Sequence, residues 1–354
     1  MTQNTTLIGM YNFPMDMTSL PVTIGEASYG HRIYIQSQIH SNETHGTPVL
    51  LTLIERLKMM RVTGEVIIWP CVNRVGFYSY CVNRNGLFDP DSGQNWNRVN
   101  FLHFKPIIDY FNDKIDQMHS ISDVEKTVND LDIQLLEGGY GINKNIYNFF
   151  EPLKNALKSK YFIDVHTPEF GVEHLYCNAV SSFVCSFDIN PIILDDTDAA
   201  TFRNFMSKLY DSLSQVKNRH CANYFSNKEI VSVELPSHMP IDDEYISYWT
   251  ERLISILGAT GFITDKNRVE KTTFNEQFHD IASLKYYYAN IDGVIILTVP
   301  VGTVIDKNDL IMVIVSLDGT RQFVRAVKRG KFLCFRDKKT ILRGEWVARV
   351  LEYE

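Results

Sequence analysis

Apolar side chains recur along this chain with two different spacings. Up to about residue 260, short apolar runs of strand length alternate with segments whose apolar residues recur every three or four positions, as on one face of a helix. The strands that this pattern predicts are 32–38, 66–72, 161–166 and 229–235. The clearest helices are 48–60, 202–216 (capped by Asp196 or Thr197) and 243–257. Such alternation is typical of an α/β layered domain.

The remaining segments have other patterns. Residues 104–160 are mostly polar with helical apolar spacing, and we expect a helical insertion there without visible chemistry. After about residue 275 the chain changes to short β-rich runs separated by turn signals such as Asp318-Gly319. The sequence therefore predicts a catalytic domain over 1–275 and a small all-β, barrel-like domain over 276–354 that caps or flanks the site.

Composition narrows the class of protein. The 354 residues carry a formal charge of −7 with no long basic run, which argues against a nucleic-acid partner or an anionic membrane. No apolar run approaches the roughly 20 residues of a spanning helix, and residues 1–17 lack a signal-peptide pattern. The six cysteines form no Cys-x-x-Cys pair, as expected for reduced thiols. We expect a cytoplasmic protein; the sequence does not indicate its oligomeric state.

The first candidate chemistry lies directly after the predicted strand 32–38. His40 and Glu43 place an imidazole and a carboxylate three positions apart in a strand-to-helix loop. Sites in open α/β sheets are normally built at the carboxyl ends of the strands. A lone His-x-x-Glu occurs more often by chance among surface residues than in a metal site, so the pair needs further ligands elsewhere in the chain.

A third ligand is predicted at another strand end. Catalytic zinc uses three protein ligands and an open position, and two histidines with a glutamate are one established set. His166 ends the strand 161–166, and Asp164 on the same face can orient its imidazole. His45 and His174 are the alternative ligands, although each is better explained as a capping, surface or loop residue.

A hydrolase also needs a base and a cation. Glu234 is a carboxylate within an otherwise apolar strand that ends at a proline; the alternative is a glutamate turned to solvent by strand alternation. Arg84, Asn97 and Arg98 lie in an irregular Gly- and Asn-rich loop, where their donors can bind a carboxylate or an oxyanion. Ordinary surface arginines are the alternative interpretation of this loop.

Taken in order, these motifs resemble the zinc carboxypeptidase superfamily, and within it the succinylglutamate desuccinylase/aspartoacylase branch. Each motif is weak alone, but their order and spacing over about residues 30–240 are specific. The matching segments are His40-Ser-Asn-Glu43, Asn73-Arg-Val-Gly76, Arg84, Asn95-Trp-Asn-Arg98, Asp164-Val-His166 and Val233-Glu234-Leu-Pro236.

The resemblance implies a fold and a role for each residue. It implies a mixed, mostly parallel sheet flanked by helices, as in zinc carboxypeptidases, followed by a small β domain that favours small N-acylated amino acids as substrates. The implied roles are one zinc ion (Zn2+) bound by His40, Glu43 and His166, Glu234 as general base, Arg84 as oxyanion donor, and Asn97 with Arg98 as the carboxylate-binding pair.

This chain departs from the family pattern at several positions. Gln38 and Ser41 stand where the family usually has glycine, so the loop must fit without a positive φ or tolerate strain. Asn95 replaces an aspartate that supports a zinc-binding histidine. A tyrosine that often closes the site has no clear motif here, and the cluster 286–288 is better interpreted as an aromatic packing stripe.

The sequence thus predicts zinc-dependent hydrolysis of an amide bond adjacent to a free carboxylate, most simply the deacylation of a small N-acyl amino acid. A metallocarboxypeptidase acting on short or modified peptides is the first alternative. The second alternative is a metal-binding scaffold without turnover, although a degenerate site has no need to keep Arg84, Asn97, Arg98 and Glu234 together.

Overall fold

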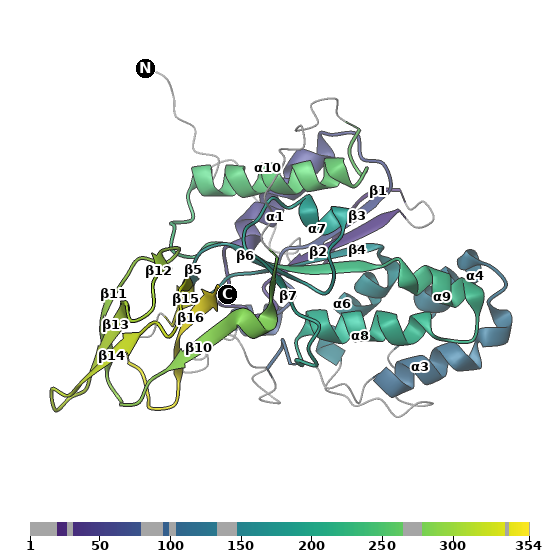
Figure 1. Cartoon of the computed structure of the whole chain (residues 1–354). Coiled ribbons are helices and arrows are strands. Elements are labelled where there is room, and N and C mark those ends of the chain that lie inside the picture. Colours follow the sequence, from purple (N-terminus) through teal and green to yellow (C-terminus); the bar gives the residue numbers. More distant parts are fainter. Residues whose placement is uncertain are drawn as a thin grey trace, which may run out of the picture.

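A computed structural model describes residues 20–26, 31–78, 95–98, 104–132, 147–264, 278–336 and 340–353. Its largest element is an eight-stranded sheet in the order β1-β3-β2-β4-β8-β6-β7-β9 (Figure 1). The strands are β1 (Val22–Gly25), β2 (Arg32–Ser37), β3 (Glu65–Trp69), β4 (Tyr161–His166), β6 (His174–Cys177), β7 (Ile192–Leu194), β8 (Glu229–Glu234) and β9 (Phe278–Asp280).

The central strands run in one direction. β3, β2, β4 and β8 pair in parallel, whereas β1 and β6 pair antiparallel to β3 and β8. All six residues of β2 are buried, as expected for a strand covered by helices on both faces. The register places Ser37 beside Val165 and His166 beside Glu234, so β2, β4 and β8 end at one edge of the sheet. The predicted mixed, mostly parallel sheet is confirmed.

Helices cover both faces of this sheet (Figure 1). On one face, α1 (Gly46–Lys58), α7 (Ser182–Cys185) and α10 (Asp243–Ala259) pack on residues such as Ile35 and Ile163. On the other face, α3 (Phe104–Asp113), α4 (Ile121–Asn129), α6 (Tyr147–Lys158), α8 (Phe202–Ser214) and α9 (Arg219–Ser226) pack on Tyr34 and Phe162. Successive residues of one strand therefore enter different cores.

The predicted cap of α8 is wrong. The N-cap is Thr201, whose side chain accepts a hydrogen bond from the Asn204 N–H. Asp196 and Thr197 lie before the helix, in a turn where the Asp195 carboxylate accepts bonds from both the N–H and the hydroxyl of Thr197. This local bonding removes Thr197 from any capping role.

The polar segment 104–160, for which we expected helices, lies between the parallel strands β3 and β4. Within its described residues, α3, the short 3-10 helix η4 (Ile115–Gln117), α4 and α6 account for most of 104–132 and 147–160. The sequence Gly138-Gly-Tyr-Gly141 lies outside the described residues. No helix among those described is long and apolar enough to cross a membrane.

The C-terminal part is all-β, as predicted. One sheet contains β10 (Leu284–Tyr288), β12 (Val304–Ile305), β15 (Gly330–Phe335) and β16 (Trp346–Glu352), and a second contains β11 (Val294–Thr298), β13 (Leu310–Val315) and β14 (Arg321–Arg325). The proposed boundary at 275/276 falls in 265–277, outside the described residues, and stays a prediction. β9, just after it, joins the large sheet.

The two parts are joined by strand pairing. β5 (Phe170–Gly171), just after the end of β4, pairs antiparallel with β15 of the C-terminal part. Gly171 lies opposite Cys334, and a Cβ on this glycine would lie 2.4 Å from the Cys334 Cβ. The joint therefore brings β15 and its neighbour β16 close to the edge where β4 ends.

Candidate metal centre and its cavity

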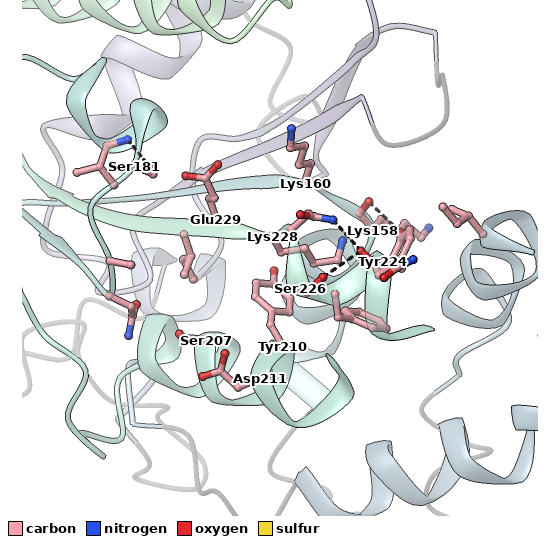
Figure 2. Close-up of a pocket in the computed structure, with 18 residues that line it drawn as sticks. Lys158, Lys160, Ser181, Ser207, Tyr210, Asp211, Tyr224, Ser226, Lys228 and Glu229 are labelled. Carbon is pink, nitrogen blue, oxygen red and sulfur yellow. Dashed lines mark hydrogen bonds between the residues drawn. The ribbon is translucent and has the colours of Figure 1, made fainter. Parts of the chain in front are cut away.

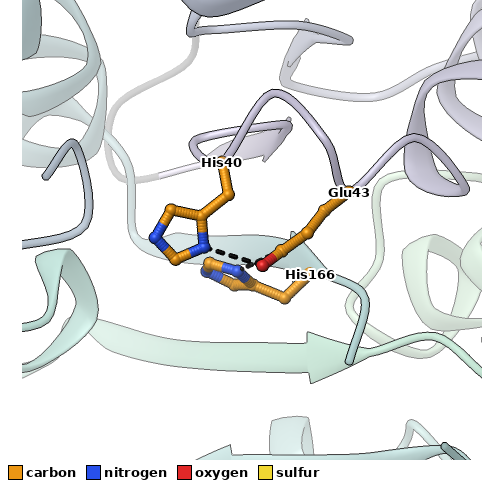
Figure 3. Close-up of side chains that lie close together, drawn as sticks. All are labelled: His40, Glu43 and His166. Carbon is orange, nitrogen blue, oxygen red and sulfur yellow. Dashed lines mark hydrogen bonds and ion pairs between the residues drawn. The ribbon is translucent and has the colours of Figure 1, made fainter. Parts of the chain in front are cut away.

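His40, Glu43 and His166 come together at this edge of the sheet (Figure 3). Their candidate ligand atoms all lie within 4.8 Å of one another. One Glu43 oxygen is 2.7 Å from His40 Nδ1, and the other is 2.8 Å from His166 Nδ1. Among the described residues these three form a group that can hold a metal ion, and the donor set fits one with a preference for nitrogen and oxygen ligands.

The loop after β2 aims the first two ligands. The Glu43 N–H donates to the His40 carbonyl over 3.0 Å, which turns the chain so that both side chains face one point. Gln38 adopts a left-handed backbone conformation with φ 55°, so this position has the conformation for which glycine is usually needed. The side-chain nitrogen Nε2 of Gln38 donates to the Ser41 backbone carbonyl over 2.6 Å, and its side-chain oxygen Oε1 accepts from the Thr47 hydroxyl. Ser41 needs no positive φ.

The outer nitrogens of both imidazoles are held by polar side chains. His166 Nε2 is 3.0 Å from the Asp164 carboxylate, and His40 Nε2 is 3.2 Å from Asn95 Oδ1. Asn95 therefore keeps a contact of the kind an aspartate would make, without its charge. Because the Nε2 atoms are engaged in this way, the Nδ1 atoms face the candidate metal position.

Electrostatics favour a cation within this group. Burial alone would raise the pKa of Glu43, but the imidazoles of His40 and His166 hold it well below its usual range. Burial opposes protonation of His166, yet Asp164 and Glu43 raise the pKa of His166 well above its usual value. A proton on His166 thus supplies positive charge between two carboxylates, and a metal ion would supply it in the same place.

The two alternative histidine ligands lie outside the group. His45 is the N-cap residue of α1 and packs edge-on against the Tyr245 ring, with its ring centroid 5.5 Å away. His174 is fully buried in β6 and has Nδ1 3.0 Å from the Val172 carbonyl. Burial lowers the pKa of His174 to about 3, so it stays neutral near pH 7.

Glu234 ends β8 directly beside His166. Its Oε2 atom is buried and has no hydrogen-bond partner among the described residues. Burial raises the pKa of Glu234, while the nearby His166 charge lowers it. An unpaired carboxylate oxygen beside a candidate metal ligand is available for proton transfer.

The metal group opens into a cavity of about 960 Å³. Glu234, Asn97 and Arg98 line it, whereas Arg84 lies outside the described residues. The side-chain oxygen Oδ1 of Asn97 accepts a 2.7 Å hydrogen bond from the Phe202 N–H at the start of α8, so in the side chain only the NH2 group remains to donate to a ligand. Arg98 Nη1 donates to the backbone carbonyl of Asn97 over 2.6 Å.

The C-terminal part supplies another wall of this cavity, which the motifs did not reveal. Arg336, Trp346 and Arg349 line it, together with Tyr286. Tyr286 thus reaches the site, whereas the other two tyrosines of the cluster do not line it. Trp346 and Arg349 belong to a short β-rich run of the sequence, 346–352. Nothing in that run indicates that its side chains line a cleft.

A second cavity of about 650 Å³ lies at the opposite ends of β4 and β8 (Figure 2). Lys158, Lys160 and Lys228 line it. Lys228 donates to the Ser159 carbonyl over 2.8 Å and lies 4.1 Å from the centre of the Tyr224 ring. These lysines precede the strands, whereas His166 and Glu234 end them, so this cavity is separate from the metal group.

The sheet order, the helical layers and the group at the strand ends define a zinc-carboxypeptidase-like fold. A scan of family models and a search of curated proteins gave no match. Solved structures do match. One from Shewanella amazonensis and one from Shewanella frigidimarina, both described as succinylglutamate desuccinylase/aspartoacylase proteins, have TM-scores of 0.76 and 0.77, are each 19% identical to this chain and cover 94% of it.

The matched regions cover 93% and 92% of those two chains. A product-bound ectoine utilization protein from Ruegeria pomeroyi has a TM-score of 0.60 at 16% identity, with 94% of this chain and 88% of that one covered. The two Shewanella structures are described as members of the branch that the motifs resemble, which confirms the resemblance. At these identities the likeness establishes the fold.

Proposed function

We propose that this protein is a zinc-dependent hydrolase that cleaves an amide bond next to a free carboxylate, and that its substrate is a small N-acyl amino acid. The observation that carries the proposal is Glu234, whose unpaired buried oxygen lies in the same cavity as the three candidate ligands. The shared fold with desuccinylase/aspartoacylase proteins supports the same reaction class.

The candidate ligands and Glu234 have different roles in the proposed reaction. A zinc ion held by His40, Glu43 and His166 would supply Lewis acidity, which activates a water molecule and polarises the scissile carbonyl. Glu234 takes the proton of that water on its carboxylate and delivers it to the leaving amine. Burial raises the pKa of Glu234, which suits a carboxyl group that must hold a proton during the reaction.

Cations and donors bind the substrate in this proposal. Arg98 and the Asn97 amide hold the free carboxylate, and both line the cavity. Arg84 remains the proposed oxyanion donor from the resemblance, in a segment outside the described residues. Asp164 and Asn95 keep the two imidazoles oriented.

A carboxypeptidase acting on short or modified peptides is the second candidate. The cavity of about 960 Å³ favours it, because this volume lies near the upper end of small-molecule sites. A scaffold without turnover is disfavoured, since it has no use for the unpaired carboxylate of Glu234. A screen of N-acyl amino acids and dipeptides against the zinc-loaded protein decides between the two hydrolases.

Two substitutions test the proposed roles. Glu234→Gln should keep bound zinc but lose roughly 100-fold or more in turnover, because the amide cannot accept the proton. His166→Ala should lose most of the bound zinc, as measured by elemental analysis of the purified protein. Near-native turnover of Glu234→Gln would refute the assignment of the base, and unchanged metal content in His166→Ala would refute the ligand set.

A further inference from the structure

A buried polar residue interrupts the central strand β2. Gln36 has no exposed surface, and helices cover both faces of the sheet around it. Its neighbour in β4 is Asp164, and two positions earlier in these strands Tyr34 lies beside Phe162. Burying an amide side chain costs free energy unless it is hydrogen-bonded. Gln36 therefore needs partners at both ends of its amide.

A chain of three hydrogen bonds joins the Gln36 side chain to the candidate metal centre. The Tyr34 hydroxyl donates to Gln36 Oε1 over 2.7 Å, and Gln36 Nε2 donates to Asp164 Oδ1 over 2.8 Å. The other oxygen of Asp164, Oδ2, is 3.0 Å from His166 Nε2. Tyr34, Gln36 and Asp164 are each fully buried. Two residues of β2 are thus connected to a candidate ligand in β4 through a single carboxylate.

The carboxylate of Asp164 sets the direction of every bond in this chain. An ionised carboxylate only accepts hydrogen bonds, so it needs the NH2 end of the Gln36 amide and an N–H of the imidazole. The amide then presents its oxygen to Tyr34, whose hydroxyl must donate. The opposite orientation of the amide would bring two acceptor oxygens to hydrogen-bonding distance. The Tyr34 hydroxyl therefore holds the amide in the orientation that Asp164 requires.

The same chain determines which nitrogen of His166 faces the metal position. Asp164 Oδ2 accepts the proton of Nε2, which leaves Nδ1 to bind an ion. Asp164 has no surface exposed to water, so its Oδ1 atom depends on a donor from the protein. Gln36 supplies that donor, and Tyr34 in turn fixes Gln36.

We propose that Tyr34 and Gln36 are positioning residues of the zinc site, which act on His166 through Asp164. Neither residue belongs to the candidate ligand group or lines its cavity. The inference rests on the zinc site of the proposed function, but not on the reaction. It accounts for a tyrosine and a glutamine two positions apart on one buried face of the central strand.

Removal of one hydroxyl tests the far end of the chain. Tyr34→Phe keeps the ring that stacks on Phe162, with ring centres 5.2 Å apart, and deletes only the donor to Gln36. We expect zinc to bind about three- to tenfold more weakly, at or below the lower end of the effects of groups that orient metal ligands. Competition of the zinc-loaded protein with a chromophoric chelator measures the dissociation constant.

Tyr210→Phe is the matched control. Tyr210 is buried in the same apolar core as Tyr34, and its hydroxyl donates to the Ala156 carbonyl over 2.8 Å. Urea unfolding of the zinc-free proteins should show a similar loss of stability in both variants, whereas the zinc affinity of Tyr210→Phe should equal that of the parent. An equal loss of zinc affinity in both would show a general effect on the fold and would overturn the proposal.

A second substitution tests whether the two residues act through one chain. Gln36→Leu removes the donor to Asp164 and should weaken zinc binding about tenfold or more. Adding Tyr34→Phe to Gln36→Leu should cause no further loss, because the hydroxyl no longer has an amide to orient. Losses that multiply in the double variant would contradict the proposal. If Gln36→Leu did not fold, the comparison of the two tyrosine variants would still decide.

The outcomes separate this inference from the proposed function. Unchanged zinc affinity in Tyr34→Phe would overturn the inference and leave the function standing. The expected losses of zinc affinity, in a parent protein that hydrolyses no N-acyl amino acid or dipeptide, would contradict the function and support the inference. A parent protein that binds no zinc would contradict both.

Discussion

Gln38 shows how a single residue can occupy a glycine position. A left-handed conformation costs a residue with a Cβ free energy, and this chain offsets it with side-chain hydrogen bonds to Ser41 and Thr47. The carbonyl of Gln38 also accepts from the Asn73 N–H over 3.1 Å. The side chain therefore ties together the loop that aims His40 and Glu43.

This arrangement predicts the effect of restoring the glycine. Gln38→Gly relieves the strained backbone but loses two side-chain hydrogen bonds and gains chain entropy on unfolding, and we expect a net loss of about 1 kcal/mol in the free energy of unfolding. Gln38→Ala keeps the strained backbone without the side-chain hydrogen bonds, so its loss in the free energy of unfolding should be larger than that of Gln38→Gly. Urea unfolding of the zinc-free proteins measures both. A Gln38→Gly protein more stable than the parent would mean that strain outweighs the hydrogen bonds.

The proximity of the three candidate ligands could be predicted at the residue scale because strand ends are visible in the sequence. His40, Glu43 and His166 each follow or end an apolar run, and parallel strands end at one edge. The ion pairs of Arg336 could not be predicted, because one of its partners, Glu169, lies in a segment far away in the sequence. Sequence shows where side chains emerge, but not which of them remain unpaired.

At the scale of elements, the start of α8 depends on a distant loop. The side-chain oxygen Oδ1 of Asn97 accepts a hydrogen bond from the N–H of Phe202, one of the amides that a helix cannot satisfy by itself. Thr201 satisfies another through its hydroxyl. The loop that carries Arg98 is thus fixed to the helix.

Two substitutions of Asn97 separate this role from substrate binding. Asn97→Ala should lower the free energy of unfolding by about 1 kcal/mol, as for the loss of a helix cap. Asn97→Asp keeps the accepting oxygen and should retain most of the stability, but it replaces the donating amide with a charge that repels a substrate carboxylate. Thermal unfolding measures the stability of each variant, and KM reports the effect on the proposed substrate binding. Equal loss of stability in both variants would contradict the capping role.

Long elements were easier to predict than short ones. The central strands β2, β4 and β8 lie within a residue of their predicted limits, because apolar residues mark the centre of each. β6 and β7 have four and three residues and were not predicted. Strands this short carry too few side chains to show a period, and their pairing with β8 and with each other determines them.

At the scale of the whole molecule, the two parts meet at the β5–β15 pairing. Gly171 has no room for a side chain there, since an added Cβ would lie 2.4 Å from the Cys334 Cβ and 2.8 Å from the Leu333 carbonyl oxygen. β16, which carries Trp346 and Arg349, is the next strand along. The position of that cavity wall depends on this close approach.

Gly171→Ala should therefore disturb both stability and the site. We expect a loss of about 1–3 kcal/mol in the free energy of unfolding, because the two strands must separate. Turnover of N-acyl substrates should fall with it. Gly258→Ala in α10 is the control: nothing lies within 4 Å of its added Cβ, and it should gain about 0.5–1 kcal/mol. Denaturant unfolding compares the two, and an unaffected Gly171→Ala protein would show that the joint can widen freely.

The two-part organisation could be predicted from the change to short β-rich runs after residue 275. The contribution of the second part to the cavity could not, because it follows from β5, a two-residue strand that gives no signal in the sequence. β9 belongs to the large sheet although it lies beyond the predicted boundary.

The order of strands also bears on when the candidate metal centre can form during synthesis. β4 lies between β2 and β8 in the sheet, but it is made more than a hundred residues after β2. A ribosome-bound chain of 150 residues would therefore carry His40 and Glu43 without His166, and the candidate metal centre would be incomplete. The proposed zinc ion would bind only after the centre of the sheet has formed, so its binding would mark a chain that has completed this slow, long-range step.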